Sequence, residues 1–469
     1  MAQVQRQSGR LNKPEAGGSQ DGYEPAAVGR KRRSIDACTL LSGYLILLMI
    51  IPATLVFQPL GAAGGPATIY AALLLVFCLV TLLHPALTMD RGRQPVRTMV
   101  LLFACVILAS YISANRHAMP VLERNAADRG LIFTFGWVGV TVLAADGIRT
   151  MDRLRTLISR LVLGAAAMAV LGMAQFFTGL DAAKYIKIPG LSALSDYSDL
   201  LSRGSLNRPS ATASHPIEFG AVLVLALPLA INQVRFSPPG KRFRKWAQVA
   251  AIGGTAPMTV SRSAILGLVL TGLIILPTWP KAERRIAYVA ALLGSAVMWV
   301  SVHGLVGTIT NLFTNIGNDT STQSRSNAFA AAGVYVSHDP WLGRGLGTFL
   351  PQTYFYIDDQ YLTSLIETGV VGLIALLAIF ITGALTARRA RGLALEPRDR
   401  DLGQCLMACM VIAAVSFFTY DALSFSMDSG LTFLVFGLCG AYWRLQRQAS
   451  TPQSLVAPDA FLPAVAPAS

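Results

Sequence analysis

The sequence predicts an all-α polytopic membrane protein with about twelve transmembrane helices and one long extracytoplasmic loop. Apolar residues make up 53% of the chain and charged residues only 14%. The apolar residues gather in runs of roughly 17–25, the length at which a helix crosses the hydrocarbon core of a bilayer. Each run is expected to be helical, because a backbone in lipid finds hydrogen-bond partners only within its own helix.

Twelve runs along the chain meet this criterion. They span residues 37–57, 62–83, 98–114, 130–145, 157–179, 216–233, 246–260, 263–279, 286–306, 364–387, 402–420 and 429–446. The two runs that flank Ser261-Arg262-Ser263 could instead form one long helix that breaks near Pro257. That alternative would change the number of spans by one and reverse the orientation of every later span.

Basic residues favour the count of twelve. With the N-terminus inside, they fall on alternate loops, as the positive-inside rule requires. These basic loops lie at 30–33, 91–97, 149–155, 235–245, 281–285, 388–400 and 444–447. Merging the two doubtful runs would place the basic loops at 235–245 and 281–285 on opposite sides. The sequence therefore predicts twelve spans, with both termini cytoplasmic.

Composition also bears on the partners and metals to expect. The net charge of +14 resides mostly on the short inner loops, without the basic and aromatic surface that a nucleic-acid site needs, so no nucleic acid is expected. All six cysteines fall within the expected spans. A disulfide framework or a metal site is therefore not expected, and the cysteines read as small packing residues.

Both ends are expected to be flexible cytoplasmic tails. Residues 1–34 are rich in Gly, Gln, Arg and Lys, and residues 448–469 in Ala, Pro and Ser. Neither stretch can bury enough apolar surface to offset the entropy that ordering removes. The membrane domain is expected to span residues 35–447.

Three segments on the expected outer side, 203–220, 261–263 and 307–364, hold the candidate site. The first carries an Asn-Arg-Pro turn with Arg208, followed by residues suited to the start of a helix. Unpaired N–H groups at such a start favour an anion, so Arg208 and His215 are candidates. The alternative is a capped helix in which a glutamate, Glu218, complements the dipole.

The second segment places Arg262 between two apolar runs with almost no loop. An arginine at mid-membrane costs about 2.5–3.5 kcal/mol on insertion scales, and less near the interface. The tight turn leaves the side chain little room to escape, which favours a functional role. The alternative is an interfacial arginine that reaches lipid phosphates.

The third segment is the longest polar stretch inside the apolar chain. It contains Arg325 and the glycine-rich run 342–347, which includes Arg344. Glycines allow close approach of the backbone, and their N–H groups are available to anionic oxygens, although such a run is more often a turn. The run lacks the Gly-Lys-Ser/Thr of a nucleotide-binding loop.

Two adjacent carboxylates, Asp358 and Asp359, close this segment, and Tyr361 and Glu367 follow in the next apolar run. Neighbouring side chains on a helix point in different directions, so one carboxylate could face the arginines while the other caps the helix. A purely structural double N-cap is the alternative, since acidic residues favour helix N-termini.

Together these stretches resemble the O-antigen ligase and O-antigen polymerase superfamily of bacterial envelope enzymes, over roughly residues 200–385. The order, spacing and common side of the motifs carry the resemblance. The motifs are Arg208-Pro-Ser-Ala-Thr, His215-Pro216, Phe219-Gly220, Ser261-Arg262, Ser324-Arg325, Pro340-Trp-Leu-Gly343-Arg-Gly345-Leu-Gly347, Tyr361-Leu362 and Glu367-Thr-Gly369. The first 200 residues match only in being hydrophobic and multi-span.

Members of this superfamily transfer a glycan from a polyprenyl pyrophosphate to an acceptor hydroxyl outside the cytoplasmic membrane. The resemblance implies a multi-pass enzyme of the bacterial inner membrane that needs no nucleotide sugar, metal or other cofactor. The implied partners are the polyprenyl-pyrophosphate-linked glycan, the lipid bilayer and other polysaccharide assembly proteins.

Arginine suits the leaving group of this reaction. It binds phosphate bidentately while staying ionised, and holding the charge that develops on the pyrophosphate lowers the barrier. Arg208, Arg262 and Arg325 are therefore the expected pyrophosphate clamp, with Arg262 also counted as catalytic. Arg344 is a further candidate, and an exposed loop residue is its alternative.

One departure from the family bears on the base. Family ligases commonly have His-Asn where this chain has Asp358-Asp359. An aspartate, with an ordinary pKa of about 3.9, is a weaker base than histidine unless burial raises that pKa. Asp358 is the expected base or orienting group, and His215 is the alternative. The expected supporting residues are Glu218, Asp359, Tyr361 and Glu367.

Three functions are compatible with the sequence. The first is polymerisation of lipid-linked oligosaccharide repeats into an envelope or exopolysaccharide, which the departure at Asp358 mildly favours. The second is ligase-type transfer of a finished glycan to a lipid or protein acceptor. The third is a transporter or flippase of lipid-linked glycan, which would place charges at mid-membrane, whereas Arg160 is the only basic residue clearly inside an expected span.

Overall fold

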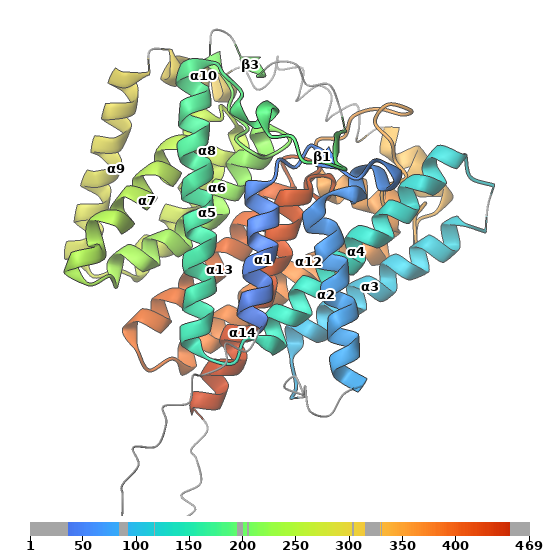
Figure 1. Cartoon of the computed structure of the whole chain (residues 1–469), viewed down its shortest axis with the longest axis horizontal. Coiled ribbons are helices and arrows are strands. Elements are labelled where there is room, and N and C mark those ends of the chain that lie inside the picture. The colour runs from blue at the N-terminus through green and yellow to red at the C-terminus, as the bar shows by residue number, and fades with distance from the viewer. Residues whose placement is uncertain are drawn as a thin grey trace, which may run out of the picture. The chain divides into compact units, whose positions relative to one another are not determined.

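The computed structural model describes residues 36–83, 92–116, 118–194, 200–203, 206–302, 304–314, 329 and 331–450. This part of the chain is almost entirely helical (Figure 1). The helices are α1 (Ala37–Ile50), α2 (Pro66–Leu83), α3 (Pro95–Ala114), α4 (Val121–Gly147), α5 (Met151–Thr178), α6 (Pro216–Arg235), α7 (Pro239–Met258), α8 (Arg262–Ile275), α9 (Lys281–Ser301), α10 (Leu305–Thr314), α12 (Gln360–Leu393), α13 (Pro397–Phe417) and α14 (Ser426–Ser450). The expected tails at 1–34 and 451–469 lie outside the described residues.

Six of the described helices are long and apolar enough to cross a membrane: α3, α4, α5, α6, α12 and α13. A seventh crossing results if the 3-10 helix η1 (Gln58–Gly64) and α2, which meet at 80°, count as one bent span. The chain is thus an all-α, multi-pass membrane protein. Each of the twelve apolar runs overlaps a described helix, but the count of twelve crossings and the long outer loop stay predictions.

The core of the bundle forms around α6 and α14. In the apolar window of α6, 89% of the residues are buried, and Phe433 of α14 stacks on Trp137 of α4 with ring centroids 4.9 Å apart. A helix that is apolar all round is buried by protein or lipid on every side. By contrast α9, at one edge of Figure 1, exposes Leu292 and Trp299. Because α6 is packed by other helices along most of its length, the residues at its two ends are held in place.

Helices α7 and α8 are separated by a turn rather than a kink. The helix α7 ends at Met258, one residue after Pro257, and α8 begins at Arg262. Between them Val260 has a φ of 48°, a left-handed conformation that a β-branched residue rarely adopts. Both helices pack against α6. The two runs that flank this turn therefore form two helices.

Ion pairs join the helices at one end of the bundle, which we call the basic face. Arg155, in the first turn of α5, bonds Asp399 of α13 at 2.6 Å, and Arg97 of α3 bonds Asp146 of α4 at 2.8 Å. Arg235, at the end of α6, pairs with Asp401 of α13. The turns between α4 and α5, between α6 and α7 and between α12 and α13 therefore meet on this face.

The other ends of these helices carry short strands and loops, and we call this end the site face. Strand β1 (Leu55–Val56) pairs with β2 (Ser192–Ala193) in antiparallel register, with Leu55 opposite Ala193. A second pair, β3 (Ser202–Arg203) and β4 (Leu206–Asn207), leads to the start of α6. Labels β1 and β3 mark this end at the top of Figure 1. Helix α5 runs towards the site face and α6 returns from it.

Candidate functional site

His215 is the N-cap of α6, as its composition led us to expect. Its Nδ1 accepts a hydrogen bond of 3.1 Å from the N–H of Ile217, and its ring packs 5.9 Å from the ring of Phe425. Burial, together with the charge of Arg208, lowers the pKa of His215 to about 4. The imidazole is therefore neutral near pH 7, and because Nδ1 is the acceptor, Nε2 carries the proton. This arrangement suits a hydrogen-bond donor better than a base.

Glu218 ties the starts of two helices together. Its Oε2 accepts from the N–H of Ser214 at 2.8 Å and from the Ser214 hydroxyl at 2.7 Å. Its Oε1 accepts from the N–H of Met427 at 2.7 Å and of Asp428 at 3.4 Å. The side chain is fully buried, so these donors satisfy it completely. Glu218 thus caps α6 and α14 together, which is a structural role close to the alternative raised by the sequence.

Two of the expected arginines lie at the same turn. The Nε of Arg208 donates to the carbonyl of Thr259 at 3.1 Å, three residues before Arg262 opens α8. Gly220 of α6 lies against the same turn, and a Cβ at this position would lie 3.0 Å from the Thr259 hydroxyl. The absence of a side chain at Gly220 therefore lets α6 pack closely on the turn. The Phe219-Gly220 motif therefore acts through packing: it seats α6 against the turn that carries Arg262.

A cavity of about 490 Å³ opens beside Arg208 on the site face. Its wall includes a second cation, Lys184, and an acid, Asp181, which also binds the amide of Gln175 at 2.8 Å. Its other lining residues come mainly from the segments at 52–55, 183–201 and 210–216. A cavity with both charges and apolar walls can receive a polar group that remains attached to a lipid.

The two adjacent aspartates have separate positions. Asp359 is the N-cap of α12, and its Oδ1 accepts from the N–H groups of Tyr361 at 2.8 Å and Leu362 at 3.3 Å. Asp358, one residue earlier, is half-buried outside the helix. The split between a capping and a non-capping aspartate is one of the two arrangements expected from the sequence. Tyr361 has a packing role, because its hydroxyl donates to the carbonyl of Ala414 at 2.6 Å.

Asp421 is the residue that the sequence reasoning missed. It lies in the loop between α13 and α14, and burial together with the negative charge of Asp358 raises its pKa to about 7. The loop is held to α12, because the side chain of Gln360 accepts the N–H of Leu423 at 2.6 Å. The available signal was a carboxylate directly after an apolar run on the expected outer side, next to Tyr420.

The glycine-rich run clasps a break in α12. Gly369 interrupts that helix with φ at 67°, and a Cβ there would lie 2.3 Å from the backbone of Trp341. The broken helical bonds are replaced: the N–H of Gly345 donates to the carbonyl of Glu367 at 2.7 Å, and Val370 donates to the carbonyl of Pro340 at 2.9 Å. The glycines therefore serve this close backbone contact.

The carboxylate of Glu367 binds backbone N–H groups at the end of this run and just after it, those of Gly347 and Phe349. Its Oε1 accepts from the N–H of Phe349 at 3.1 Å, and the side chain is buried. N–H groups that the sequence offered to an anion are thus used partly by an internal carboxylate. Glu367 fixes the loop that follows the run, which agrees with a supporting role.

Arg344 points into a buried polar group instead of an open surface. Its guanidinium bonds Glu123 of α4 at 2.9 Å and the Tyr354 hydroxyl at 2.5 Å, and lies over the rings of Tyr335 and Tyr354. Tyr354 in turn donates to Glu123 at 2.5 Å. These contacts anchor the long segment to α4, so they suit a positioning role better than pyrophosphate binding.

Arg325, the third arginine of the expected clamp, lies outside the described residues. The structure thus brings the side chain of Arg208 to the turn before Arg262, and places Asp358 close enough to Asp421 for its charge to raise the pKa of Asp421. The ring contact between His215 and Phe425 brings the same α13–α14 loop to the start of α6. Among the described residues, no group of three or more His, Cys, Asp or Glu side chains is arranged to hold a metal ion.

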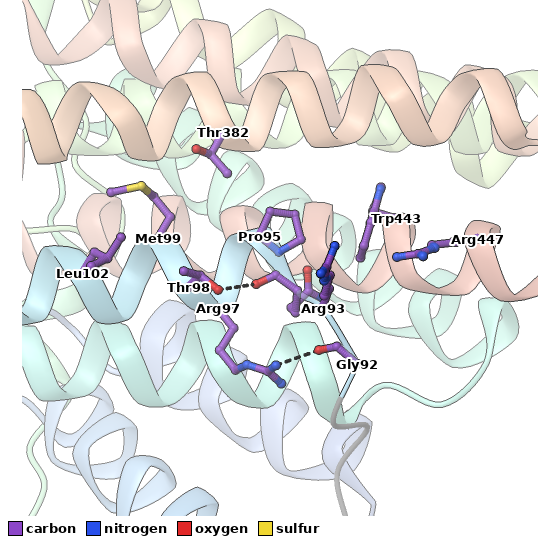
Figure 2. A pocket seen from close by; sticks show the side chains of 11 residues that line it. Gly92, Arg93, Pro95, Arg97, Thr98, Met99, Leu102, Thr382, Trp443 and Arg447 are labelled. Atoms are coloured by element: carbon purple, nitrogen blue, oxygen red, sulfur yellow. Dashed lines mark hydrogen bonds between the residues drawn. The ribbon is translucent and has the colours of Figure 1, made fainter.

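A second cavity lies away from these residues. It measures about 660 Å³ and opens on the basic face between α3, α12 and α14. Figure 2 shows Arg93, Arg97 and Arg447 around it, with Trp443 beside Arg447. It contains none of the candidate site residues, which belong to the other end of the bundle.

Comparison with known proteins supports the resemblance noted in the sequence. A model of the O-antigen ligase family matches residues 247–377. The match confirms the resemblance to the O-antigen ligase and polymerase superfamily. This O-antigen ligase segment runs from α7 into α12 and includes Arg262, Arg344 and Asp358. Arg208 and His215 lie before it, although the fold brings Arg208 to its turn at Thr259.

The other comparisons are more distant. One solved chain, described as "Structural coordination of polymerization and crosslinking by a peptidoglycan synthase complex", is similar at 14% identity with a TM-score of 0.40. The similarity covers 75% of this chain and 98% of that one. No curated protein matches the chain.

Proposed function

We propose that the protein polymerises lipid-linked oligosaccharide repeats by glycosyl transfer on the site face. The observation that carries the proposal is the contact of Arg208 with Thr259, in the turn that leads to Arg262 within the O-antigen ligase segment. Arginine binds the oxygens of a pyrophosphate in pairs and keeps its charge through the reaction. An enzyme of this class needs such a site, because its leaving group is a lipid pyrophosphate.

In the proposed reaction, the arginines stabilise the leaving group. As the bond between the anomeric carbon and the pyrophosphate oxygen breaks, negative charge builds on that oxygen. Preorganised cations lower the barrier when they lie where this charge develops. Arg208 and Arg262 are proposed for this role, and Arg325 remains a candidate from the sequence. The neutral Nε2–H of His215 would add a hydrogen bond to the same phosphate oxygens.

The base is proposed to be the pair Asp358 and Asp421. A carboxylate of this pair takes the proton of the acceptor hydroxyl. The acceptor oxygen meanwhile forms the bond to the anomeric carbon, with inversion. A general base works best when its pKa lies near the operating pH. Asp421, whose pKa burial and Asp358 raise to about 7, meets this condition better than an ordinary aspartate. Asp358 then acts both on the acceptor and on the pKa of its neighbour.

A ligase is the second candidate, because the matching family model is that of an O-antigen ligase. A ligase would use the same arginines and the same base, and only the acceptor would differ. We further propose that the basic face lies towards the cytoplasm of a bacterial inner membrane, in keeping with the positive-inside rule. The site face would then meet its glycans on the outer side.

The experiment compares the wild-type protein with Arg208→Ala and Arg262→Ala in vesicles supplied with lipid-linked repeats. Arg285→Ala is the matched control, since it removes an exposed arginine on α9. Both site variants should lose at least a hundredfold in release of polyprenyl pyrophosphate, whereas the control should be unchanged. Wild-type chain lengths in both site variants would refute the proposal.

The acceptor is tested separately by gel analysis of a strain that lacks the gene. Single repeats on the carrier lipid or core would point to a polymerase. Intact polymer with an uncapped acceptor would point to a ligase. Movement of lipid-linked glycan across proteoliposomes without any glycan product would instead support a transporter.

A further inference from the structure

We propose that the end of α6 on the basic face holds a site for a phosphate-bearing anion, separate from the glycosyl-transfer site. A cavity of about 260 Å³ lies there between α5, α6, α7 and α13. Four cationic side chains line it: Arg155, Lys241, Lys245 and Arg398. Helix α6 has 20 residues and is therefore about 30 Å long, which separates this cavity from Arg208 at its other end.

The strongest sign of a ligand is the amide of Gln233, which lines the cavity and is only 8% exposed. Its Oε1 accepts hydrogen bonds from the ammonium of Lys245 and from the hydroxyl of Ser159. An ammonium group only donates hydrogen bonds, so the atom it contacts must be the amide oxygen. The remaining polar atom of the amide is therefore the donor Nε2. Within the described residues, that Nε2 has no hydrogen-bond partner.

Two further buried donors beside this cavity also lack a hydrogen-bond acceptor within the described part of the chain, the Nε of Arg155 and the Nε of Arg398. A buried donor left without a partner destabilises the fold, so three beside one cavity are unusual. Each needs an oxygen acceptor. A phosphate group supplies several acceptor oxygens on one centre, together with the negative charge that the cavity lacks.

The charges around the cavity also favour an anion. On one side Arg155 is paired with Asp399 at 2.6 Å and Glu396 at 2.9 Å. On the other side Lys245 experiences electrostatic repulsion from Lys241, Arg244 and Arg398. Asp152 adds one more acid near Arg155, at 3.1 Å. The cations therefore outnumber the acids. The excess lies on the α7 side, beside the Nε2 of Gln233.

The chemistry fits two sources of phosphate. One is the headgroup of an anionic phospholipid, since basic pockets between helices at a membrane surface bind such headgroups. The other is free phosphate or a soluble phosphate ester. Both would use Gln233, Arg398 and the α7 lysines in the same way. The two sources differ in whether binding requires a lipid.

The decisive variant is Gln233→Glu. It places a carboxylate among the cations, where it would act as an internal counter-ion and repel a phosphate. The structure therefore predicts a variant that is more heat-stable than the wild type when no phosphate is present, yet does not respond to phosphate. A variant that merely failed to fold would lose stability instead. Arg242→Gln is the matched control, because Arg242 is an exposed cation on α7 that does not line the cavity.

The experiment uses the full chain purified in detergent. Thermal unfolding is measured in inorganic phosphate and in chloride at equal ionic strength. In a second arm, delipidated protein is mixed with phosphatidylcholine vesicles with and without phosphatidylglycerol, and the retained phosphatidylglycerol is counted by native mass spectrometry. The wild type and Arg242→Gln should respond in at least one arm, and Gln233→Glu should respond roughly tenfold less in that arm. A response in the first arm identifies free phosphate, and a response confined to the second identifies a lipid.

Two results would overturn the proposal. One is the absence of any phosphate or phosphatidylglycerol response in the wild type. The other is a Gln233→Glu variant that responds as strongly as the wild type. Neither result bears on the glycosyl-transfer proposal, because that reaction is measured by release of polyprenyl pyrophosphate at the opposite face.

Discussion

The carboxylate of Glu218, near the start of α6, accepts a 2.7 Å hydrogen bond from the N–H of Met427, near the start of α14. The same carboxylate also binds Ser214. One buried side chain thus holds together the two central helices at the site face. Because α14 begins just after the loop that carries Asp421, this bond also sets the position of the proposed base.

Loss of the Glu218 carboxylate should destabilise the protein. In Glu218→Ala the N–H groups of Ser214 and Met427 lose their acceptor inside the protein, and each buried donor without a partner costs about 1–3 kcal/mol. The free energy of unfolding should therefore fall by roughly 3 kcal/mol. Thermal unfolding in detergent measures this loss. Glu218→Gln keeps one acceptor oxygen and should recover part of it; equal melting temperatures for the wild type and Glu218→Ala would contradict the capping role.

The pair Asp358 and Asp421 predicts a pH dependence of transfer. A base with a pKa of about 7 is mostly protonated below pH 6, so kcat/KM should rise about tenfold per pH unit and level off above pH 7. In Asp421→Asn this rising limb should disappear and the rate should fall at least a hundredfold. The readout is the pH profile of polyprenyl pyrophosphate release.

Substitution of the neighbouring aspartate should shift the same profile. The negative charge of Asp358 opposes ionisation of Asp421, so Asp358→Asn should lower the pKa of Asp421 and move the rising limb to lower pH. Residual activity, measured between pH 5 and 8, is sufficient to locate the limb. A limb that stays in place would show that the charge of Asp358 does not influence the base.

The pair of Arg344 and Glu123 should show strong coupling. The carboxylate of Glu123 is 5% exposed in this ion pair, and removal of one member of a buried pair costs about 3–5 kcal/mol. Arg344→Met and Glu123→Gln should each be destabilising, while the double variant should recover much of the loss. A double-mutant cycle on unfolding free energies tests this. Additive effects would mean that Arg344 and Glu123 do not stabilise each other, as expected if Arg344 binds the substrate instead.

The break in α12 depends on Gly369. At φ 67° an alanine is strained by about 1–2 kcal/mol, and its Cβ would in addition collide with the backbone of Trp341. Gly369→Ala should therefore lower the melting temperature strongly. Gly392→Ala in the same helix meets no atom within 4 Å and should be neutral or slightly stabilising. Similar melting temperatures for the two variants would argue against the close packing of the glycine-rich run on the break in α12.

Much of the site could be anticipated because its motifs are local. A helix start needs a capping residue, and the residues around His215 and Asp359 fit that requirement in both places. A polar side chain at the end of an apolar run is also visible without a fold. The sequence therefore indicated Arg208, Arg262 and Asp358 as candidates, and the O-antigen ligase segment includes two of these three.

The roles of individual residues could not be anticipated, because they depend on partners far away in the chain. The glycines at 343–347 were compatible with a turn or with an anion-binding loop, and the structure places them against Glu367 and Gly369. Arg344 was a candidate for pyrophosphate binding, with an exposed loop residue as the alternative, and the structure places it beside Glu123, 221 positions earlier. No local pattern reports such contacts.

The sequence alone determined that this chain is an all-α membrane protein, because the polar backbone of an apolar run in lipid must satisfy its hydrogen bonds within its own helix. It also determined which ends of those helices are rich in charge, since charges avoid the hydrocarbon. Only the tertiary structure decided which helix ends meet. It placed Asp358 near Asp421, set Arg208 beside the turn that leads to Arg262 and packed the glycine-rich run against Gly369, because such contacts form between residues that are far apart in the chain.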